Sequence, residues 1–327
     1  MGYKTLQQIT STHDGKVSDK WAAYLNAYEE VLAEYQDATV KLLEIGVQNG
    51  GSLEIWEQYF SNLQTIVGCD INPSISQLEY QNPSINLVVG NATEDDTAKQ
   101  ILEHCNSFNI IIDDGSHRSD DIILTFARYF PVLELNGLFI IEDLHCSFWE
   151  EFQGGLFEPF SSLSFLKRLS DIINHEHWGI QKSRVEHLAK YGEKYGCEFD
   201  EEELKKIHSI EFINSMCIIR KKEADLNKLG KRIFSGQKEL IAACSEEYAG
   251  TELISPDQSE NYWSFQGTSL EDQLSNSLKE IEALKDSNET LNHKICDLEN
   301  KILEYETSVS WKLTKPIRLF TSSKKAS

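Results

Sequence analysis

Two short stretches of the chain place acidic side chains and a histidine directly after apolar runs. Asn109 to His117 is NIIIDDGSH, and Gly137 to His145 is GLFIIEDLH. Unbroken branched apolar runs are typical of strands buried on both faces of a parallel sheet, and open α/β sheets bind ligands at the carboxyl ends of such strands. If the two strands are neighbours, four side chains should converge on one point: Asp114, Glu142, Asp143 and His117.

Those residue types suit metal-assisted acid–base chemistry. Three carboxylates favour a hard divalent cation such as Mg²⁺, and a nearby imidazole suits a general base. A bound cation lowers the pKa of a coordinated hydroxyl, and open coordination positions would favour a vicinal diol. The alternative is that the acids are solvated strand ends and His117 a turn residue. Asp113 either faces a cofactor or closes the turn, whereas His145, His175 and His177 match no role.

A glycine-rich turn near residue 46 predicts a nucleotide-type anchor. A strand over Thr39 to Gly46 runs into it, and a helix over Leu53 to Phe60 follows. The dinucleotide fingerprint needs a glycine where Gln48 stands, and the chain has no Tyr-x-x-x-Lys sequence, which argues against the common dehydrogenases. The pattern Glu44-x-Gly46-x-x-x-Gly50 resembles motif I of class I S-adenosylmethionine-dependent methyltransferases. That resemblance implies cofactor binding by Glu44, Gly46 and Gly50.

Two further strand ends extend the candidate cofactor site. Asp70 ends a strand predicted over Gln64 to Ile71, where a carboxylate can accept both ribose hydroxyls. Asn91 follows a strand over Asn86 to Val89, at the place where such folds contact the adenine edge. The alternative for both Asp70 and Asn91 is a simple helix cap.

The remaining pattern predicts an α/β, Rossmann-like methyltransferase sheet of seven strands, mostly parallel. Apolar spacing predicts a helix over Ser18 to Glu34, capped by Ser18 or Asp19, in which Tyr24 and Tyr28 pack. A second amphipathic helix spans Pro159 to Asn174. A hairpin around Asn214-Ser215 should place the last strand antiparallel at the sheet edge.

The segments VSDKWAAYLNAYEEVL, LLEIGVQNGGS, IIDDGSH and IIEDLHCSFWEEFQGG resemble the metal-dependent sugar O-methyltransferases, which act on macrolide sugars and bacterial surface glycans. The resemblance covers residues 1 to about 220. It implies that Asp114, Glu142 and Asp143 hold Mg²⁺ and that His117 is the base. The chain departs from the family at Cys146-Ser147-Phe148-Trp149, where the family often has Thr-Ser-Tyr-Trp.

The C-terminal part has a heptad pattern. Position a holds Leu274, Ile281, Asn288, Ile295 and Ile302, and position d holds Leu284, Leu291 and Leu298. Isoleucine at a with leucine at d predicts a parallel homodimer through Leu270–Tyr305, with Asn288 fixing the register. A single amphipathic helix docked on the domain is the alternative. A cationic, aromatic tail over Trp311–Phe320 suits an anionic membrane surface or is a disordered end.

Composition restricts the remaining possibilities. The net charge of −22 argues against a nucleic-acid partner, but the balance is uneven, with five basic and no acidic residues after position 307. Seven scattered cysteines and no apolar run long enough for a membrane span predict a cytoplasmic protein. The cationic tail adds a peripheral contact with the inner membrane face to that prediction. The predicted divisions are a methyltransferase domain, a helical linker, a coiled coil and a basic tail, over residues 1–222, 223–266, 267–307 and 308–327.

The sequence therefore predicts an S-adenosylmethionine- and Mg²⁺-dependent O-methyltransferase that acts on a sugar hydroxyl of a bacterial surface polysaccharide or its precursor. One alternative is the same chemistry on a small glycosylated natural product. The other is a non-catalytic coiled-coil scaffold of polysaccharide assembly, for which the set of acids and His117 would have no use.

Overall fold

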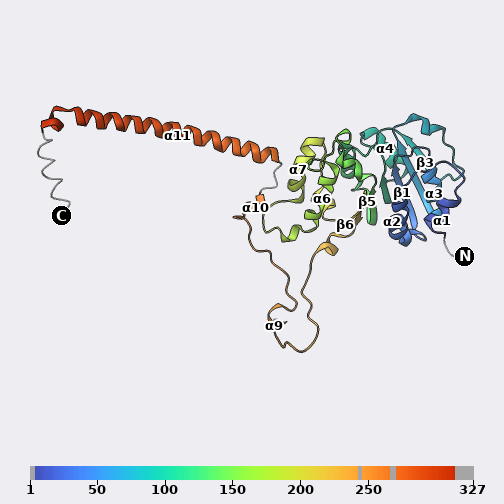
Figure 1. The fold of residues 1–327 in the computed structure, drawn as a ribbon. Coiled ribbons are helices and arrows are strands. Elements are labelled where there is room, and N and C mark those ends of the chain that lie inside the picture. Colours follow the sequence, from blue (N-terminus) through green and yellow to red (C-terminus); the bar gives the residue numbers. More distant parts are fainter. Residues whose placement is uncertain (1–3, 242–244, 266–269, 314–327) are drawn as a thin grey trace. The chain divides into compact units, whose positions relative to one another are not determined.

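The structure, a computed structural model, describes residues 4–241, 245–265 and 270–313. Its contacts divide the chain into two compact units, residues 1–264 and 265–327. The first unit contains the sheet and the candidate site, and the second contains the long helix α11, Leu270–Thr307 (Figure 1).

The first unit is built on one seven-stranded sheet with the order β3-β2-β1-β4-β5-β7-β6. The strands are β1 Thr39–Ile45, β2 Asn62–Asp70, β3 Ile85–Val89, β4 Phe108–Asp113, β5 Leu133–Ile141, β6 Ile207–Ile213 and β7 Met216–Lys221. The first five pair in parallel, and β7 is antiparallel to both of its neighbours. The prediction of a mostly parallel methyltransferase sheet with an antiparallel last strand is confirmed.

The predicted place of that last strand is wrong. β7 lies between β5 and β6, so the edge of the sheet is β6. Burial explains the order, because Met216 to Ile219 are completely covered whereas most of β6 is partly or fully exposed. An apolar strand is more stable inside the sheet, and a strand with polar positions tolerates the edge.

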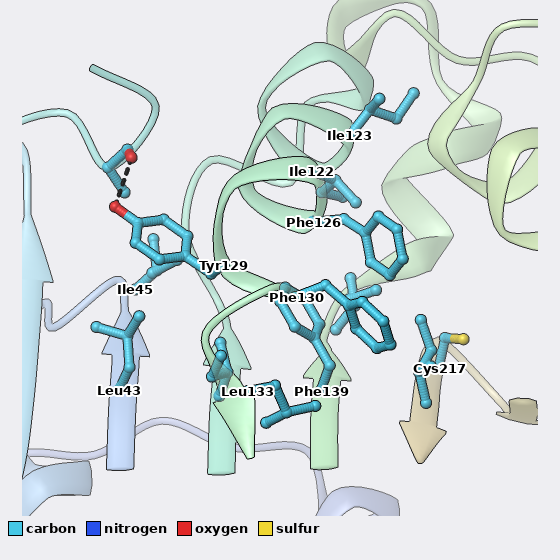
Figure 2. Close-up of a cluster of buried hydrophobic side chains, with 14 of the residues drawn as sticks. Leu43, Ile45, Ile122, Ile123, Phe126, Tyr129, Phe130, Leu133, Phe139 and Cys217 are labelled. Atoms are coloured by element: carbon cyan, nitrogen blue, oxygen red, sulfur yellow. Dashed lines mark hydrogen bonds between the residues drawn. The ribbon is translucent and has the colours of Figure 1, made fainter. Parts of the chain in front are cut away.

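Helices cover both faces of the sheet. One face is covered by α1 Leu6–Thr12, α2 Ala22–Leu32 and α3 Gly51–Tyr59; the other by α4 Asp95–His104, α5 Ser119–Tyr129, α6 Ser162–Ile173, α7 Arg184–Tyr195 and α8 Glu201–Leu204. Alternate strand residues enter alternate cores, as Leu42 and Leu43 do. Figure 2 shows the core beneath α4 to α8, where Phe126 of α5 and Phe130, the residue that caps this helix, stack on each other.

Short helical turns complete the described chain. They are η1 Ala33–Tyr35, η2 Pro73–Gln77, η3 Leu144–Phe148, η4 Glu150–Phe152, η5 His175–His177, η6 Ala224–Asn227, α9 Ser245–Tyr248 and α10 Tyr262–Phe265. Two of them, η3 and η4, directly follow the Glu142-Asp143 pair and shape one side of the candidate site.

Helix α2 begins later than predicted. Its N-cap is Trp21, which makes no side-chain capping bond, so the predicted caps Ser18 and Asp19 are wrong. The residues before it form an extended segment that packs against the start of α3. The Gly51 amide donates to the Val17 carbonyl, and the Lys16 ammonium lies 2.7 Å from Glu54 Oε1. These bonds hold Ser18 to Trp21 over the carboxyl ends of the strands.

The second unit confirms a long C-terminal helix. The described apolar side chains of its heptad pattern are about half exposed or more: Ile281, Leu284, Leu291, Ile295, Leu298 and Ile302. The structure holds one chain and does not test the predicted coiled coil. Of the predicted membrane-contact segment, residues 314–320 lie outside the described residues. Within the described ranges, no helix combines the length and apolar character needed to cross a membrane.

Candidate active site

The predicted site residues meet in one cavity of about 550 Å³ at the carboxyl ends of β1, β2, β4 and β5. Its lining includes nine of them: Glu44, Gly46, Asp70, Asn91, Asp113, Asp114, His117, Glu142 and Asp143. Gly50 is not part of the lining. The volume is in the range of small-molecule and cofactor sites.

The glycine turn brings two strand ends together. Gly46 has φ +93°, and a Cβ atom there would lie 2.0 Å from the carbonyl oxygen of Asp114. The Asp114 amide in turn donates to the Ile45 carbonyl at 2.8 Å. Gly50, also left-handed at φ +83°, starts helix α3. Gly46 is therefore required by the close approach of the loop that carries Asp114, and Gly50 by the helix start.

Glu44 is completely buried beneath the turn. Trp56 donates its ring N–H to Glu44 Oε2 at 2.8 Å, while Oε1 has no hydrogen-bond partner among the described residues. Burial raises the pKa of Glu44, although the positive charge of Lys20 opposes the rise. A buried acid with an unsatisfied oxygen at a cavity is suited to a cationic or hydrogen-bond-donating ligand.

Asp70 and Asn91 stabilise loops as well as lining the cavity. Asp70 Oδ2 accepts the backbone amides of Val47 and Gln48 at 2.8 and 2.9 Å, and its Oδ1 accepts the amide of Asn72. Asn91 Oδ1 accepts both the amide and the hydroxyl of Thr93. Oδ2 already accepts two amides, whereas Oδ1 accepts one and keeps a second lone pair, so Asp70 can still accept from a ligand.

Asp113 faces inward from the end of β4. Its Oδ2 accepts a hydrogen bond from the Thr125 hydroxyl of α5, and Oδ1 accepts from the Gly115 amide at 3.4 Å. Burial raises the pKa of Asp113 to about 7, against the opposing effect of the Thr125 bond. The side chain both closes the turn and lines the cavity, so the two alternatives left by the sequence are compatible.

Asp114, His117 and Asp143 form a cluster with the geometry of a metal site. Each offers a ligand atom, and the three atoms lie within 4.8 Å of one another. His117 Nε2 is 3.6 Å from Asp143 Oδ2. His117 and Asp143 both have positive φ, +58° and +55°, in the left-handed region that Asp and His enter more readily than most residues. Carboxylate and imidazole ligands fit a divalent cation at this position.

Glu142 lies beside that cluster and contacts a lysine. The Lys20 ammonium is 2.7 Å from Glu142 Oε1 and also bonds Asp114 Oδ2, while the Tyr28 hydroxyl donates to the same Glu142 oxygen at 2.5 Å. Burial alone would lower the pKa of Lys20, but Glu142, Asp114 and Glu44 outweigh it and hold that pKa above its usual value. Burial raises the pKa of Glu142 above its usual range, and the positive charge of Lys20 opposes the rise.

Sequence reasoning missed the contribution of the N-terminal segment. Tyr24 and Tyr28 are buried as predicted, but their hydroxyls also reach the acids: Tyr24 donates to Asp143 Oδ1 at 2.7 Å and accepts the Asp143 amide. Trp21 donates its ring N–H to the same carboxylate at 3.1 Å. Tyr24 and Tyr28 lie four residues apart within α2, a spacing that could have indicated a shared face.

An aromatic row extends from the acids toward solvent. It consists of Trp21, His145, Trp149 and Phe152, whose ring centroids are 6.1, 5.1 and 6.0 Å apart in succession. His145, which the sequence left without a role, lies with Nδ1 2.6 Å from the Ser215 hydroxyl and 3.8 Å from Asp143 Oδ1. Trp21 and Trp149 are about half exposed, so they present ring surface beside the carboxylate cluster.

Comparison with known proteins supports the resemblance to O-methyltransferases that the sequence motifs indicated. The chain is 33% identical over 177 residues to the 8-demethyl-8-alpha-L-rhamnosyl tetracenomycin-C 2'-O-methyltransferase of Streptomyces olivaceus, covering 51% of this chain and 46% of that protein. It is 31% identical over 185 residues to the demethylmacrocin O-methyltransferase of Streptomyces fradiae, covering 52% and 45%. The chain thus spans about half the length of these curated relatives. No family model matches it.

Among solved structures, the MycE methyltransferase of the mycinamycin pathway, in complex with Mg, SAH and Mycinamycin VI, superimposes with a TM-score of 0.56 at 24% identity. The alignment covers 68% of this chain and 55% of MycE. At that identity the likeness establishes the fold.

The strand order and the cavity at the strand ends give the chain the fold of the class I S-adenosylmethionine-dependent methyltransferases. In sequence, the chain is similar to O-methyltransferases of rhamnosyl tetracenomycin-C and demethylmacrocin.

Proposed function

We propose that this protein transfers the methyl group of S-adenosylmethionine to a sugar hydroxyl of a glycosylated small molecule, with a divalent cation, Mg²⁺, at the acids. One observation carries the proposal. The glycine turn with Glu44 and Asp70, and the cluster of Asp114, His117 and Asp143, line the same cavity. A methyl donor held at the first group would have its reactive end near an acceptor held at the second.

The residues on the cofactor side fit S-adenosylmethionine. When bound, this cofactor supplies an electrophilic methyl group on a cationic sulfonium. Glu44, with its unsatisfied buried oxygen, is suited to the charged amino acid end, and Asp70 accepts from ribose hydroxyls. Gly46 allows the backbone to approach the ligand closely, while Asn91 and Asp113 complete the walls.

On the acceptor side, Asp114, Glu142 and Asp143 would hold the cation. A divalent ion supplies Lewis-acid polarisation, which lowers the pKa of a coordinated hydroxyl by several units. His117 would accept the proton of the acceptor hydroxyl at a ring nitrogen. The Asp143 carboxylate lies 3.6 Å from His117 Nε2 and would help to orient the ring. Tyr24 and Trp21 fix the Asp143 carboxylate for this task.

The aromatic row supports a sugar as acceptor. Trp21, which bonds Asp143, and Trp149, which follows His145 in the row, are about half exposed. The apolar C–H faces of a sugar ring pack against exposed aromatic rings while its hydroxyls point to polar groups. The relatives support the same class of acceptor, because the name of the Streptomyces olivaceus enzyme describes methylation of a rhamnosyl-bearing compound.

These matches favour the small glycosylated acceptor over the surface polysaccharide. The polysaccharide hypothesis rests on the C-terminal helix and the basic tail. Neither curated relative is named for an activity on a polysaccharide. We also propose that the methyltransferase domain, the linker, the coiled coil and the basic tail divide at about residues 222, 266 and 307. The scaffold hypothesis is disfavoured, because a scaffold needs no enclosed cavity lined by acids and a glycine turn.

A methyl-transfer assay with labelled S-adenosylmethionine tests the proposal against glycosylated macrolides and aromatic polyketides in one set and extracted surface polysaccharides in another. We expect Mg²⁺-dependent transfer to the first set. Trp149→Ala should raise the KM for the acceptor and leave cofactor binding unchanged, whereas Phe212→Ala, an exposed aromatic on the edge strand, should change neither. Transfer to polysaccharide alone would contradict the small-molecule acceptor, and no cofactor binding would contradict the enzyme.

A further inference from the structure

The candidate metal site contains a cation that belongs to the chain itself. The ammonium of Lys20 bonds Asp114 Oδ2 and Glu142 Oε1, which are carboxylates of two different strand ends. Its side chain is 7% exposed and that of Glu142 2%, so this is a buried ion pair and not a surface contact. Buried pairs of this kind persist because removing either partner leaves an uncompensated charge.

We propose that Lys20 is a displaceable occupant of the metal site, which leaves the carboxylates when a divalent cation binds and returns when the cation dissociates. The inference rests on the metal ligands of the proposed function. A cation held by Asp114 and Glu142 needs the carboxylate groups that Lys20 now contacts. Two positive charges on one pair of carboxylates at such distances repel strongly, so the lysine and the ion compete.

The position of Lys20 in the chain allows this exchange. Lys20 lies in the extended segment before α2, outside regular secondary structure, and its neighbours Asp19 and Trp21 are exposed. A lysine side chain has a flexible four-carbon stem, so its ammonium can reach solvent through rotations about side-chain bonds. Displacement of Lys20 therefore does not require the sheet or helix α2 to move.

The role of Glu142 distinguishes the proposed exchange from an alternative in which the ion binds without displacing Lys20. Asp114, His117 and Asp143 could hold an ion alone, with Lys20 and Tyr28 remaining on Glu142. In that case Lys20 is a permanent structural partner of Glu142. In the proposed arrangement Glu142 becomes a ligand only when Lys20 leaves. The two arrangements predict opposite behaviour of the Lys20 amine.

The first test is chemical labelling of the wild-type protein. Acetylation with an N-hydroxysuccinimide ester, followed by peptide mass spectrometry, reports how accessible each lysine amine is with and without Mn²⁺. We expect labelling of Lys20 to rise several-fold when Mn²⁺ is added. Lys41, which pairs with Glu134 at the opposite end of the sheet, serves as the internal control and should not change. Unchanged labelling of Lys20 in protein that demonstrably binds Mn²⁺ would overturn the inference.

The second test measures Mn²⁺ binding directly, by electron paramagnetic resonance of the free ion. Lys20→Met keeps the length of the side chain without its charge and should tighten binding about tenfold or more. Lys99→Met, an exposed lysine of α4 paired with Asp96, is the control and should bind as the wild type does. Glu142→Gln should weaken binding. Weaker binding in Lys20→Met, or wild-type binding in Glu142→Gln, would contradict the exchange.

The outcomes separate this inference from the proposed function. If neither the wild type nor Lys20→Met binds Mn²⁺, the metal site itself is wrong and the inference falls with it. If the wild type binds Mn²⁺ but Lys20 labelling stays low, the metal site stands and only the exchange is excluded. Binding that appears only in Lys20→Met would support Lys20 as the competing cation.

Discussion

The imidazole of His117 lies 3.6 Å from the carboxylate of Asp143, although the two residues follow different strands, β4 and β5. Both have left-handed backbone conformations. Such conformations in residues other than glycine cost free energy and recur at functional sites. The pairing across two adjacent strand ends therefore joins a candidate base to a candidate metal ligand.

The first prediction concerns His117 as the base. His117→Ala should lower kcat by roughly 10²-fold or more, the usual contribution of a general base, with little change in cofactor binding. Imidazole added to the solution should restore part of the rate, and the mutant rate should no longer fall toward acidic pH. Near wild-type kcat in His117→Ala would show that the residue only shapes the turn.

The second prediction concerns the cation. Activity should disappear in excess chelator and return with Mg²⁺, and Asp114→Asn should lose turnover while calorimetry still detects S-adenosylmethionine binding. Asp96→Asn, an exposed acid in α4, is the control and should keep full activity. Full activity in the presence of chelator would rule out the metal-assisted mechanism.

Much of this arrangement could be predicted from the sequence because parallel strands have a local pattern. Apolar runs ending in acids predicted β4 and β5, and the parallel arrangement then fixed that their carboxyl ends meet. The place of Lys20 could not be predicted in the same way, because its partners Asp114 and Glu142 are 94 and 122 residues away in the chain. The place of β7 inside the sheet could not be predicted either. It follows from the greater burial of β7 relative to β6, and the pattern of either strand alone does not show that difference.

The third prediction concerns the glycine turn. Gly46→Ala should abolish or strongly weaken cofactor binding, because its Cβ would overlap the Asp114 carbonyl and the residue would also be left-handed. Gly196→Ala is the matched control. That glycine has φ +70° but nothing within 4 Å of an added Cβ, so the substitution should cost only about 1 kcal/mol of strain. Thermal unfolding and calorimetry would measure both effects, and equal behaviour of the two variants would contradict the close-approach argument.

The fourth prediction is a pH dependence at the opposite end of the sheet. Burial alone would raise the pKa of Glu134, but hydrogen bonds from Lys41, Ser107 and Asn109 lower it below its usual value. A carboxyl whose pKa is depressed in the folded state stabilises the fold above its unfolded pKa, and this stabilisation is lost as the pH falls through the folded value.

Glu134→Gln should therefore reduce the free energy of unfolding by about 1 kcal/mol at pH 7. The difference from the wild type should shrink as the pH is lowered below the usual range of a glutamate. Urea unfolding at several pH values measures it, with methyl transfer as a control that should not change. A difference that grows toward acidic pH would show the opposite sign and contradict the assignment.

The last prediction concerns helix α11. The exposed apolar a and d side chains, among them Ile281 and Leu291, need a partner surface, and the single Asn288 at position a specifies a parallel pair. Each core layer removed from water should contribute on the order of 1.5–3 kcal/mol, so a dimer should persist at micromolar concentration.

Truncation after Gly267 should give a monomer or weaker oligomer by sedimentation, and Asn288→Ile should raise stability while loosening the choice of oligomer. Single cysteines at position 281, in a chain cleared of native cysteines, test the direction. Disulfides between 281 and 281 support the parallel pair. Failure there, with efficient cross-links between 281 and a position near 302, would show that the helices run antiparallel, because only that arrangement brings the two ends of the heptad pattern together.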